Sequence, residues 1–149
     1  MSRKNAREDA FRLIFEGMVN SDDANERLER YFGEVADPCD DCAFVNKPAK
    51  GDNDFVRKVF LGVEEKREQL DAVISSCLKG WELGRISKIS TAAMRLAVYE
   101  MMYVDDVPTG VSINEAVEIV KKYDNKQAGA FVNGALSSAA KQMVSDDGN

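Results

Sequence analysis

Apolar residues recur at every third or fourth position along most of this chain, which is the spacing of amphipathic helices. Near the N-terminus, Ala6, Ala10, Ile14 and Met18 form one such stripe. No segment alternates apolar and polar residues between turn residues, as a half-buried strand would. The pattern therefore predicts an all-α protein. The expected helices span about 3–18, 21–33, 53–83, 92–104, 112–121 and 127–143.

The range 53–83 carries two apolar stripes in succession, and Gly62 suggests a kink or close packing between them. With this block the pattern indicates a compact bundle of about seven helices. Gly84 breaks the helical pattern and favours two halves. The predicted organisation is one domain over 1–149, with helical halves at about 1–80 and 84–144, an acidic, loop-like insert at about 20–52, and a frayed polar tail at 145–149.

Serine and threonine residues mark the expected helix starts, because their hydroxyl groups accept hydrogen bonds from the first free backbone N–H groups. Ser21 precedes two acidic residues and is the expected cap of the second helix. Ser90 or Thr91 is expected to open the most apolar helix. Ser112 and Glu115 have the spacing of a capping box, which predicts that a helix starts at Ser112.

Several polar residues and one glycine lie inside expected helices without an obvious reason. Asn114, Asn133 and Gly134 are poor helix formers, so helix propensity does not explain them. Gly134 is consistent with close packing of two helices, whereas an exposed amide at Asn133 would suit a polar ligand. Arg95 and Glu100 interrupt an otherwise apolar helix. Because buried charges need partners, a structural ion pair or hydrogen-bond network is expected there.

The net charge of the chain is −6, which at first argues against nucleic acid as a partner. Eight acidic residues and two arginines lie between Asn20 and Cys42, so this segment holds the whole excess of negative charge. The rest of the chain is balanced overall. Two mildly basic regions remain, at 1–15 and 121–141.

The sequence lacks the segments that would direct a protein to a membrane or out of the cell. No stretch approaches the roughly 18 consecutive apolar residues of a membrane span, and the N-terminus has no apolar core of a signal peptide. Three cysteines, an odd number, favour a reducing compartment. We therefore expect a cytoplasmic protein without a membrane partner.

The sequence offers no reaction centre. It has no histidine, which removes the commonest general base and metal ligand, and no glycine-rich phosphate loop. Cys39 and Cys42 have metal-ligand spacing, but a structural zinc needs four ligands and only Cys77 remains. We expect no enzymatic activity, no cofactor and no metal. A zinc ion shared between two chains is the alternative for the cysteine pair.

Basic residues near the N-terminus are candidates for contact with nucleic acid. Arg3, Lys4 and Arg7 span about one helical turn, so they can approach the same phosphate backbone or stack on an unpaired base. An ordinary charged helix end is the alternative interpretation. Phe15 and Phe131 are more often core residues than platforms for base stacking.

Four short motifs follow one another along the chain. They are Ala6-Arg7-Glu8, Arg95-Leu96-Ala97-Val98-Tyr99-Glu100, Ile113-Asn114-Glu115-Ala116 and Phe131-Val132-Asn133-Gly134. Each motif alone is a weak signal, but their order and spacing together are specific. In this respect the chain resembles the NusB family of bacterial transcription antitermination factors over nearly its full length.

The resemblance implies an all-α fold of two helical subdomains without catalysis. Members of this family bind the single-stranded boxA element of ribosomal RNA leaders together with NusE, a small-subunit ribosomal protein. The complex joins the elongating RNA polymerase and suppresses premature termination. By analogy with the family, the RNA-binding face would contain Arg3, Lys4, Arg7, Lys121, Lys126, Gln127 and Phe131.

The chain departs from the family at its N-terminus. Many members carry a dense arginine cluster there, whereas this chain has only Arg3 and Lys4 before Asn5. Fewer phosphate contacts imply weaker intrinsic RNA affinity and a shallower salt dependence, so RNA binding is expected to depend on NusE. The alternative is a helical protein-interaction module or homodimer with little RNA binding of its own.

Overall fold

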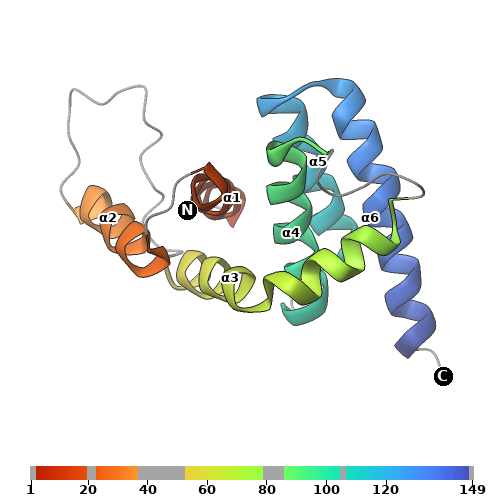
Figure 1. Cartoon of the computed structure of the whole chain (residues 1–149), viewed down its shortest axis with the longest axis horizontal. Helices are drawn as coiled ribbons and strands as arrows, with labels where there is room; N and C mark the ends of the chain where they lie inside the picture. The colour runs from red at the N-terminus through yellow and green to blue at the C-terminus, as the bar shows by residue number, and fades with distance from the viewer. Residues whose placement is uncertain (1–2, 20–22, 37–52, 79–85, 105–106, 148–149) are drawn as a thin grey trace. The chain divides into compact units, whose positions relative to one another are not determined.

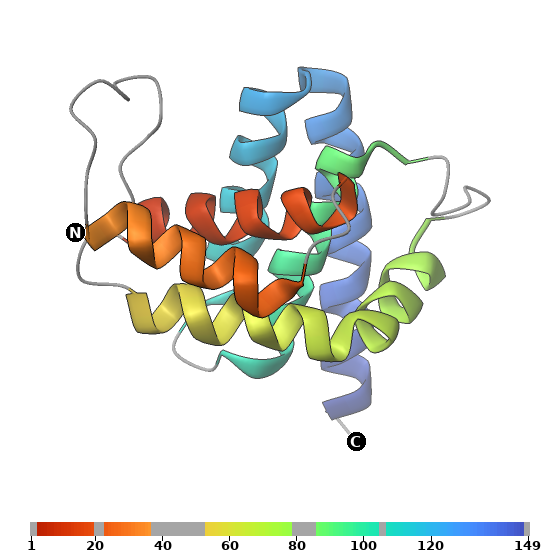
Figure 2. The same ribbon diagram turned by 60° about the vertical axis from the view of Figure 1, so that its left-hand side comes forward.

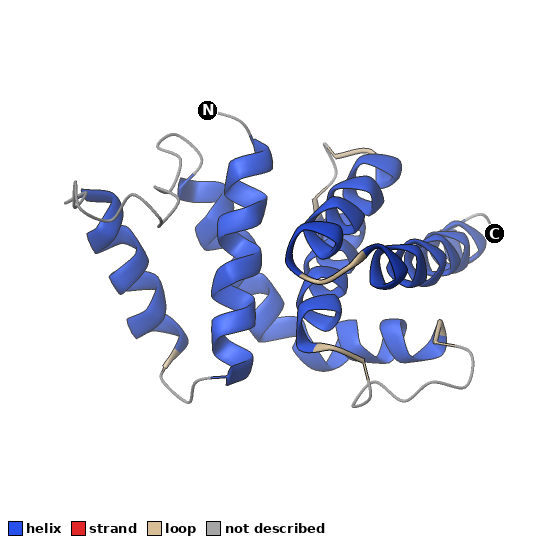
Figure 3. Cartoon of the chain, turned by 90° about the horizontal axis from the view of Figure 1, so that it is seen from above, coloured by secondary structure: helices blue, strands red, loops and turns tan. Residues whose placement is uncertain are grey.

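The computed structural model describes residues 3–19, 23–36, 53–78, 86–104 and 107–147, leaving out the side chains of 3–5, 32–36, 53 and 144–147. Every regular element in these ranges is a helix, as Figures 1 and 3 show, and the all-α prediction is confirmed. The helices are α1 (Arg3–Val19), α2 (Ala24–Ala36), α3 (Asn53–Ser76), α4 (Lys88–Tyr103), α5 (Thr109–Tyr123) and α6 (Lys126–Asp147).

The number and ends of the helices differ from expectation in two places. α3 is one continuous helix across both apolar stripes, so the described part of the chain holds six helices where about seven were expected. α6 continues to Asp147, and the prediction of a frayed tail is wrong for 145–147. None of the described helices is long and apolar enough to cross a membrane.

The start of α2 is set by an aspartate. Asp23 Oδ2 accepts hydrogen bonds from the backbone N–H groups of Asn25 at 3.0 Å and Glu26 at 3.3 Å. This carboxylate therefore caps the helix, and its charge is favourable at a helix N-terminus. Ser21, the expected cap, lies outside the described residues.

α4 and α5 both begin earlier than expected. Ser87 caps α4, where its Oγ accepts the N–H of Ser90 at 3.1 Å, so Ser90 and Thr91 lie inside the helix. α5 begins directly after Pro108, whose fixed φ suits a helix start and whose carbonyl accepts the N–H of Ser112 at 3.2 Å. Ser112 is a buried residue inside α5, and the predicted capping box is wrong.

By their internal contacts the residues form two compact units, Met1–Glu64 and Glu65–Asn149, which divide inside α3. The expected division was near Gly84, which lies outside the described residues. The first unit holds α1, α2 and the first part of α3, with α1 and α2 side by side in Figure 2. The second unit holds the rest of α3 together with α4, α5 and α6.

The first unit buries polar groups as well as its apolar core. The Tyr31 hydroxyl donates to Asp9 Oδ2 at 3.1 Å, and burial with the nearby carboxylate raises the pKa of Tyr31 above its ordinary value. The Arg27 guanidinium carbon lies 5.9 Å from the centre of the Phe60 ring. Gly17 leaves room for this side chain, because a Cβ at that position would lie 3.0 Å from Arg27 Nη1.

The core of the second unit is built around α4, which is buried on most of its faces and packs against α5 and α6. Its nearly continuous apolar sequence explains this, because a helix that is hydrophobic all round belongs in a core. The buried residues that α5 and α6 contribute include Ala116, Ile119, Val120, Val132, Ala135, Leu136 and Ala139.

Arg95 on α4 forms an ion pair with Asp71 on α3. Its Nε and Nη2 atoms each donate to one carboxylate oxygen of Asp71 on α3, both at 2.8 Å. The pair is partly buried, and its two parallel hydrogen bonds fix the orientation of both side chains. The ion pair expected for Arg95 is therefore confirmed. Glu100 is also buried.

Two glycines of α6 have opposite surroundings. A Cβ at Gly129 would lie 2.9 Å from Lys121 Cγ, so α5 and α6 approach closely there. A Cβ at Gly134 would have no atom within 4 Å. The close packing considered for Gly134 is therefore wrong within the described part of this chain, and Gly134 faces open space.

We expect Gly134→Ala to raise the free energy of unfolding by about 0.5–1 kcal/mol, because alanine loses less backbone entropy in a helix than glycine. Gly129→Ala is the matched control on the same helix, where displacement of Lys121 offsets the same gain. Urea denaturation of both variants measures the difference. Equal stabilisation at the two positions would contradict the prediction.

Candidate nucleic-acid interface

The turn between α5 and α6 carries a concentration of exposed lysines. Lys121 and Lys122 lie in the last turn of α5, and Lys126 is the first residue of α6. All three side chains are exposed. The N-terminus of α6 adds the partial positive charge of its free backbone N–H groups. An anionic ligand would therefore find several positive groups within a short stretch of surface.

Hydrogen bonds hold this turn in place. The Asp124 carboxylate accepts from Ser87 Oγ at 2.9 Å and from Asn125 Nδ2 at 3.0 Å, so each of its oxygens has a donor. Asn125 Oδ1 in turn accepts the N–H of Ala128 at 2.7 Å and caps α6. Ser87, which also caps α4, thereby links the start of α4 to the α5–α6 turn. None of these three polar residues was predicted from the sequence.

The three lysines differ in the groups that lie near their ammonium nitrogen atoms. Lys121 Nζ lies 3.8 Å from Glu118 Oε1 on the same helix, in a loose and exposed ion pair. Lys122 Nζ lies 5.4 Å from the centre of the Tyr123 ring. Lys126 is exposed beside the turn. Exposed pairs of this kind contribute little stability, so an incoming phosphate can compete with them.

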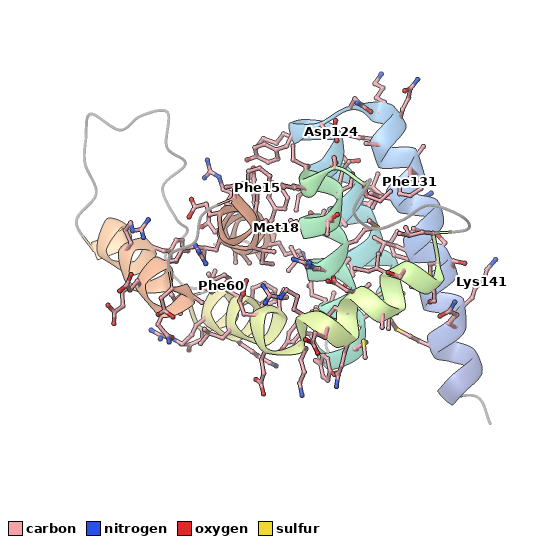
Figure 4. All side chains as sticks on the ribbon, viewed as in Figure 1. Phe15, Met18, Phe60, Asp124, Phe131 and Lys141 are labelled. Atoms are coloured by element: carbon pink, nitrogen blue, oxygen red, sulfur yellow. The ribbon has the colours of Figure 1, made fainter. Side chains whose placement is uncertain are left out.

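Gln127 and Phe131 extend the same surface along α6. They are four residues apart and so lie on one side of the helix; Gln127 is exposed and Phe131 is half-buried. Figure 4 shows Asp124 at the turn and Phe131 further along α6, whereas Lys141 lies toward the other end of that helix. The structure thus gathers four of the predicted residues at one end of α5 and α6: Lys121, Lys126, Gln127 and Phe131.

The remaining predicted residues lie in the other unit. Arg3 and Lys4 belong to the first turn of α1, and their side chains fall outside those described. Arg7 is only 5% exposed, and its guanidinium carbon lies 6.0 Å from the centre of the Phe55 ring. Its side chain is therefore part of the interior of the first unit. That Arg7 contacts RNA stays a prediction.

A groove between α5 and α6 begins beside the lysines. Its volume is about 410 Å³, and it is lined by Gly110, Ile113, Asn114, Val117, Glu118, Lys121, Asn133 and Ser137. The sequence marks Asn114 and Asn133 as unusual inside helices, but it does not show that they line one site. Ser137 was missed altogether, because nothing in a helical pattern distinguishes it from other surface serines.

The cysteines provide no candidate site in the described residues. Cys39 and Cys42 lie outside the described residues, and Cys77 is a buried free thiol. Within the described part, no group of three or more cysteine, aspartate or glutamate side chains is arranged to hold a metal ion.

Comparison with known proteins gives one consistent family. A model described as the NusB family matches residues 4–141 of the chain. A transcription antitermination protein NusB of Ruminiclostridium cellulolyticum is 36% identical over 141 residues, an alignment that covers 95% of this chain and 90% of that protein.

Solved structures agree with the sequence comparison. A NusB structure from T. maritima is 30% identical and superposes with a TM-score of 0.78, covering 95% of this chain and 92% of that one. A crystal structure of the antitermination factors NusB and NusE in complex with double-stranded RNA contains a chain that is 26% identical, with a TM-score of 0.75. That match covers 94% of this chain and 96% of that one.

Ser87→Ala should lower the free energy of unfolding by about 1 kcal/mol, because it removes the cap of α4 and the donor to Asp124. Ser75→Ala, an exposed serine of α3, is the control and should change stability by less than about 0.5 kcal/mol. Thermal and urea unfolding give both values. A neutral Ser87→Ala would show that the hydrogen bonds of Ser87 do not stabilise the protein.

Arg7→Ala should destabilise the protein by about 2 kcal/mol, because the buried guanidinium loses its contact with the Phe55 ring and the packing of its aliphatic stem. Arg12→Ala removes an arginine of the same helix that is less buried, and its effect should be smaller. Urea denaturation again makes the comparison. If Arg7→Ala weakened RNA binding and left stability unchanged, Arg7 would be a surface ligand and not a buried structural residue.

Proposed function

The chain belongs to the NusB family of transcription antitermination factors, which are not enzymes, and we propose that it binds the single-stranded boxA RNA of ribosomal RNA leaders together with NusE. In this proposal the protein–RNA complex joins the elongating RNA polymerase in the bacterial cytoplasm. The relative solved with NusE and RNA supports the two binding partners. The boxA sequence and the polymerase are carried over from the resemblance to the family.

The observation that carries the proposal is the lysine-rich α5–α6 turn. Lys121, Lys122 and Lys126 are exposed there, and Asp124 is engaged by hydrogen bonds within the protein. Lysine side chains at this density can contact successive phosphates of a single strand. Phe131 is half-buried one helical turn beyond Gln127, where a base can stack against the exposed part of its ring.

The first unit contributes less to the proposed RNA surface than the family pattern implies. Arg3 and Lys4 remain in the proposal as the basic start of α1. Arg7 is proposed to act mainly by holding this helix on the core, because its side chain is buried against Phe55. Because only Arg3 and Lys4 stand before Asn5 where many family members carry a dense arginine cluster, the isolated protein should bind RNA weakly. NusE would then supply additional contacts in the complex.

Fluorescence anisotropy of a labelled single-stranded boxA RNA tests the proposal, with and without NusE and at several salt concentrations. We expect weak binding by the isolated protein and tight, salt-sensitive binding when NusE is present.

Lys126→Ala should weaken binding to all RNA sequences alike and reduce the slope of log K against log salt by about 0.7, because one phosphate contact is lost.

Lys141→Ala is the matched control, since Lys141 is an exposed lysine toward the other end of α6. It should leave the affinity and the salt dependence unchanged. Equal RNA affinities with and without NusE would overturn the expected dependence on NusE. Formation of a complex with NusE that binds no RNA would instead favour a protein-interaction module, and sedimentation would then show whether the chain forms a homodimer.

A further inference from the structure

We propose that the groove between α5 and α6 holds one unpaired base of the bound RNA, and that the side-chain amides of Asn114 and Asn133 recognise the edge of this base. The inference rests on the proposed function, because it assumes that a single strand lies across the lysine-rich turn. It adds a place where sequence is read, which the lysines alone do not provide, since phosphate contacts carry no sequence information.

The shape of the groove suits a base. Its volume of about 410 Å³ lies within the range of small-molecule sites, so it has room for a nucleobase. Ile113 and Val117 contribute aliphatic surface on which a flat ring can lie. Asn114 belongs to α5 and Asn133 to α6, so the two amides line the groove from different helices.

The chemistry of the lining residues favours a base over other ligands. A carboxamide presents one donor and one acceptor side by side, which matches the paired donors and acceptors on the edge of a base. Both asparagines are exposed, so their amide groups are accessible to a ligand. Glu118 lines the same groove and can accept a hydrogen bond from an exocyclic amino group. A base that carries such a group, as in cytosine, adenine or guanine, is therefore the preferred ligand.

Continuity with the lysine-rich turn favours RNA over a peptide. Lys121 lines the groove and also belongs to the turn, so one residue can bind the phosphate of the nucleotide whose base enters the groove. Its ion pair with Glu118 is loose at 3.8 Å and exposed, and a phosphate can displace it. The groove thus starts where the proposed RNA surface ends.

Among the described residues, no side-chain hydrogen bond or ion pair explains why Asn114 and Asn133 stand inside helices. Both are exposed positions inside helices, where alanine would favour the helix more. Gly134, next to Asn133, leaves open space beside its backbone and keeps this part of α6 accessible. Substitution of the two asparagines should therefore leave the fold intact, which makes them suitable for a binding test.

The test combines protein variants with an abasic scan of the RNA. Anisotropy is measured for the full chain with NusE and a boxA RNA in which each nucleotide in turn lacks its base. Removal of the bound base should weaken binding to the wild-type protein by at least about 5-fold. The double variant Asn114→Ala, Asn133→Ala should lose a similar factor on intact RNA. On the RNA that lacks the bound base, the double variant should bind as tightly as the wild-type protein does, because the interaction is already absent.

The salt slope separates this contact from those of the lysines. The asparagine variants should keep the wild-type slope, whereas Lys126→Ala lowers it. Asn25→Ala on α2 is the matched control, since it removes the same amide from another exposed helix position and should bind as the wild type does. Thermal unfolding confirms that each variant is folded.

Each outcome decides between the two proposals. If the wild-type protein binds no RNA with NusE present, the proposed function fails and the base site fails with it. If RNA binds but every abasic loss is the same in the wild type and the double variant, the base site is wrong and the proposed function stands. If the double variant loses affinity for NusE in the absence of RNA, the groove is a protein-docking site and the inference is overturned.

Discussion

Burial of α4 is the interaction on which the second unit depends. α5 and α6 both pack against this helix and against each other, and both contribute buried residues to the core. Because each helix buries only one side, the opposite sides remain available for lysines, amides and the half-buried Phe131. The geometry of the candidate interface is therefore fixed by an apolar contact that lies beneath it. A change in α4 would alter the interface without touching any of its residues, since close-packed interiors transmit displacement.

The interface also shows how a chain of net negative charge can present a basic surface. Salt screens exposed charges beyond roughly 8 Å, so the lysines near a bound strand matter more than the total charge. Asp124 lies among these lysines, yet both of its oxygens accept hydrogen bonds from within the protein. The same bonds fix the turn to the start of α4 through Ser87. The Asp124 carboxylate therefore helps to hold in position the turn that carries the lysines.

The sequence predicted the helices well because a helix that buries one face has apolar residues at every third or fourth position. This spacing can be recognised within a short stretch of sequence. The prediction failed at the start of α5, where Pro108 determines the first residue and the serine-based pattern at Ser112 is incidental. The burial of Arg7 was not predicted either, because its contact with Phe55 joins residues far apart in the chain. The groove was missed for the same reason. Asn114 and Asn133 are close only because α5 and α6 are packed side by side.

Residues that oppose helix propensity fall into two groups once the structure is considered. Gly17 and Gly129 have structural reasons, since a Cβ at either position would press against Arg27 or Lys121. Gly110, Gly134 and the two asparagines of the groove differ from these, because a Cβ at either glycine would have no atom within 4 Å and both asparagines are exposed. Local exceptions that bring no gain in packing are expected at functional sites. That four such exceptions lie in or beside one groove is the reason to assign that groove a ligand, and the adjoining lysines are the reason to make that ligand RNA.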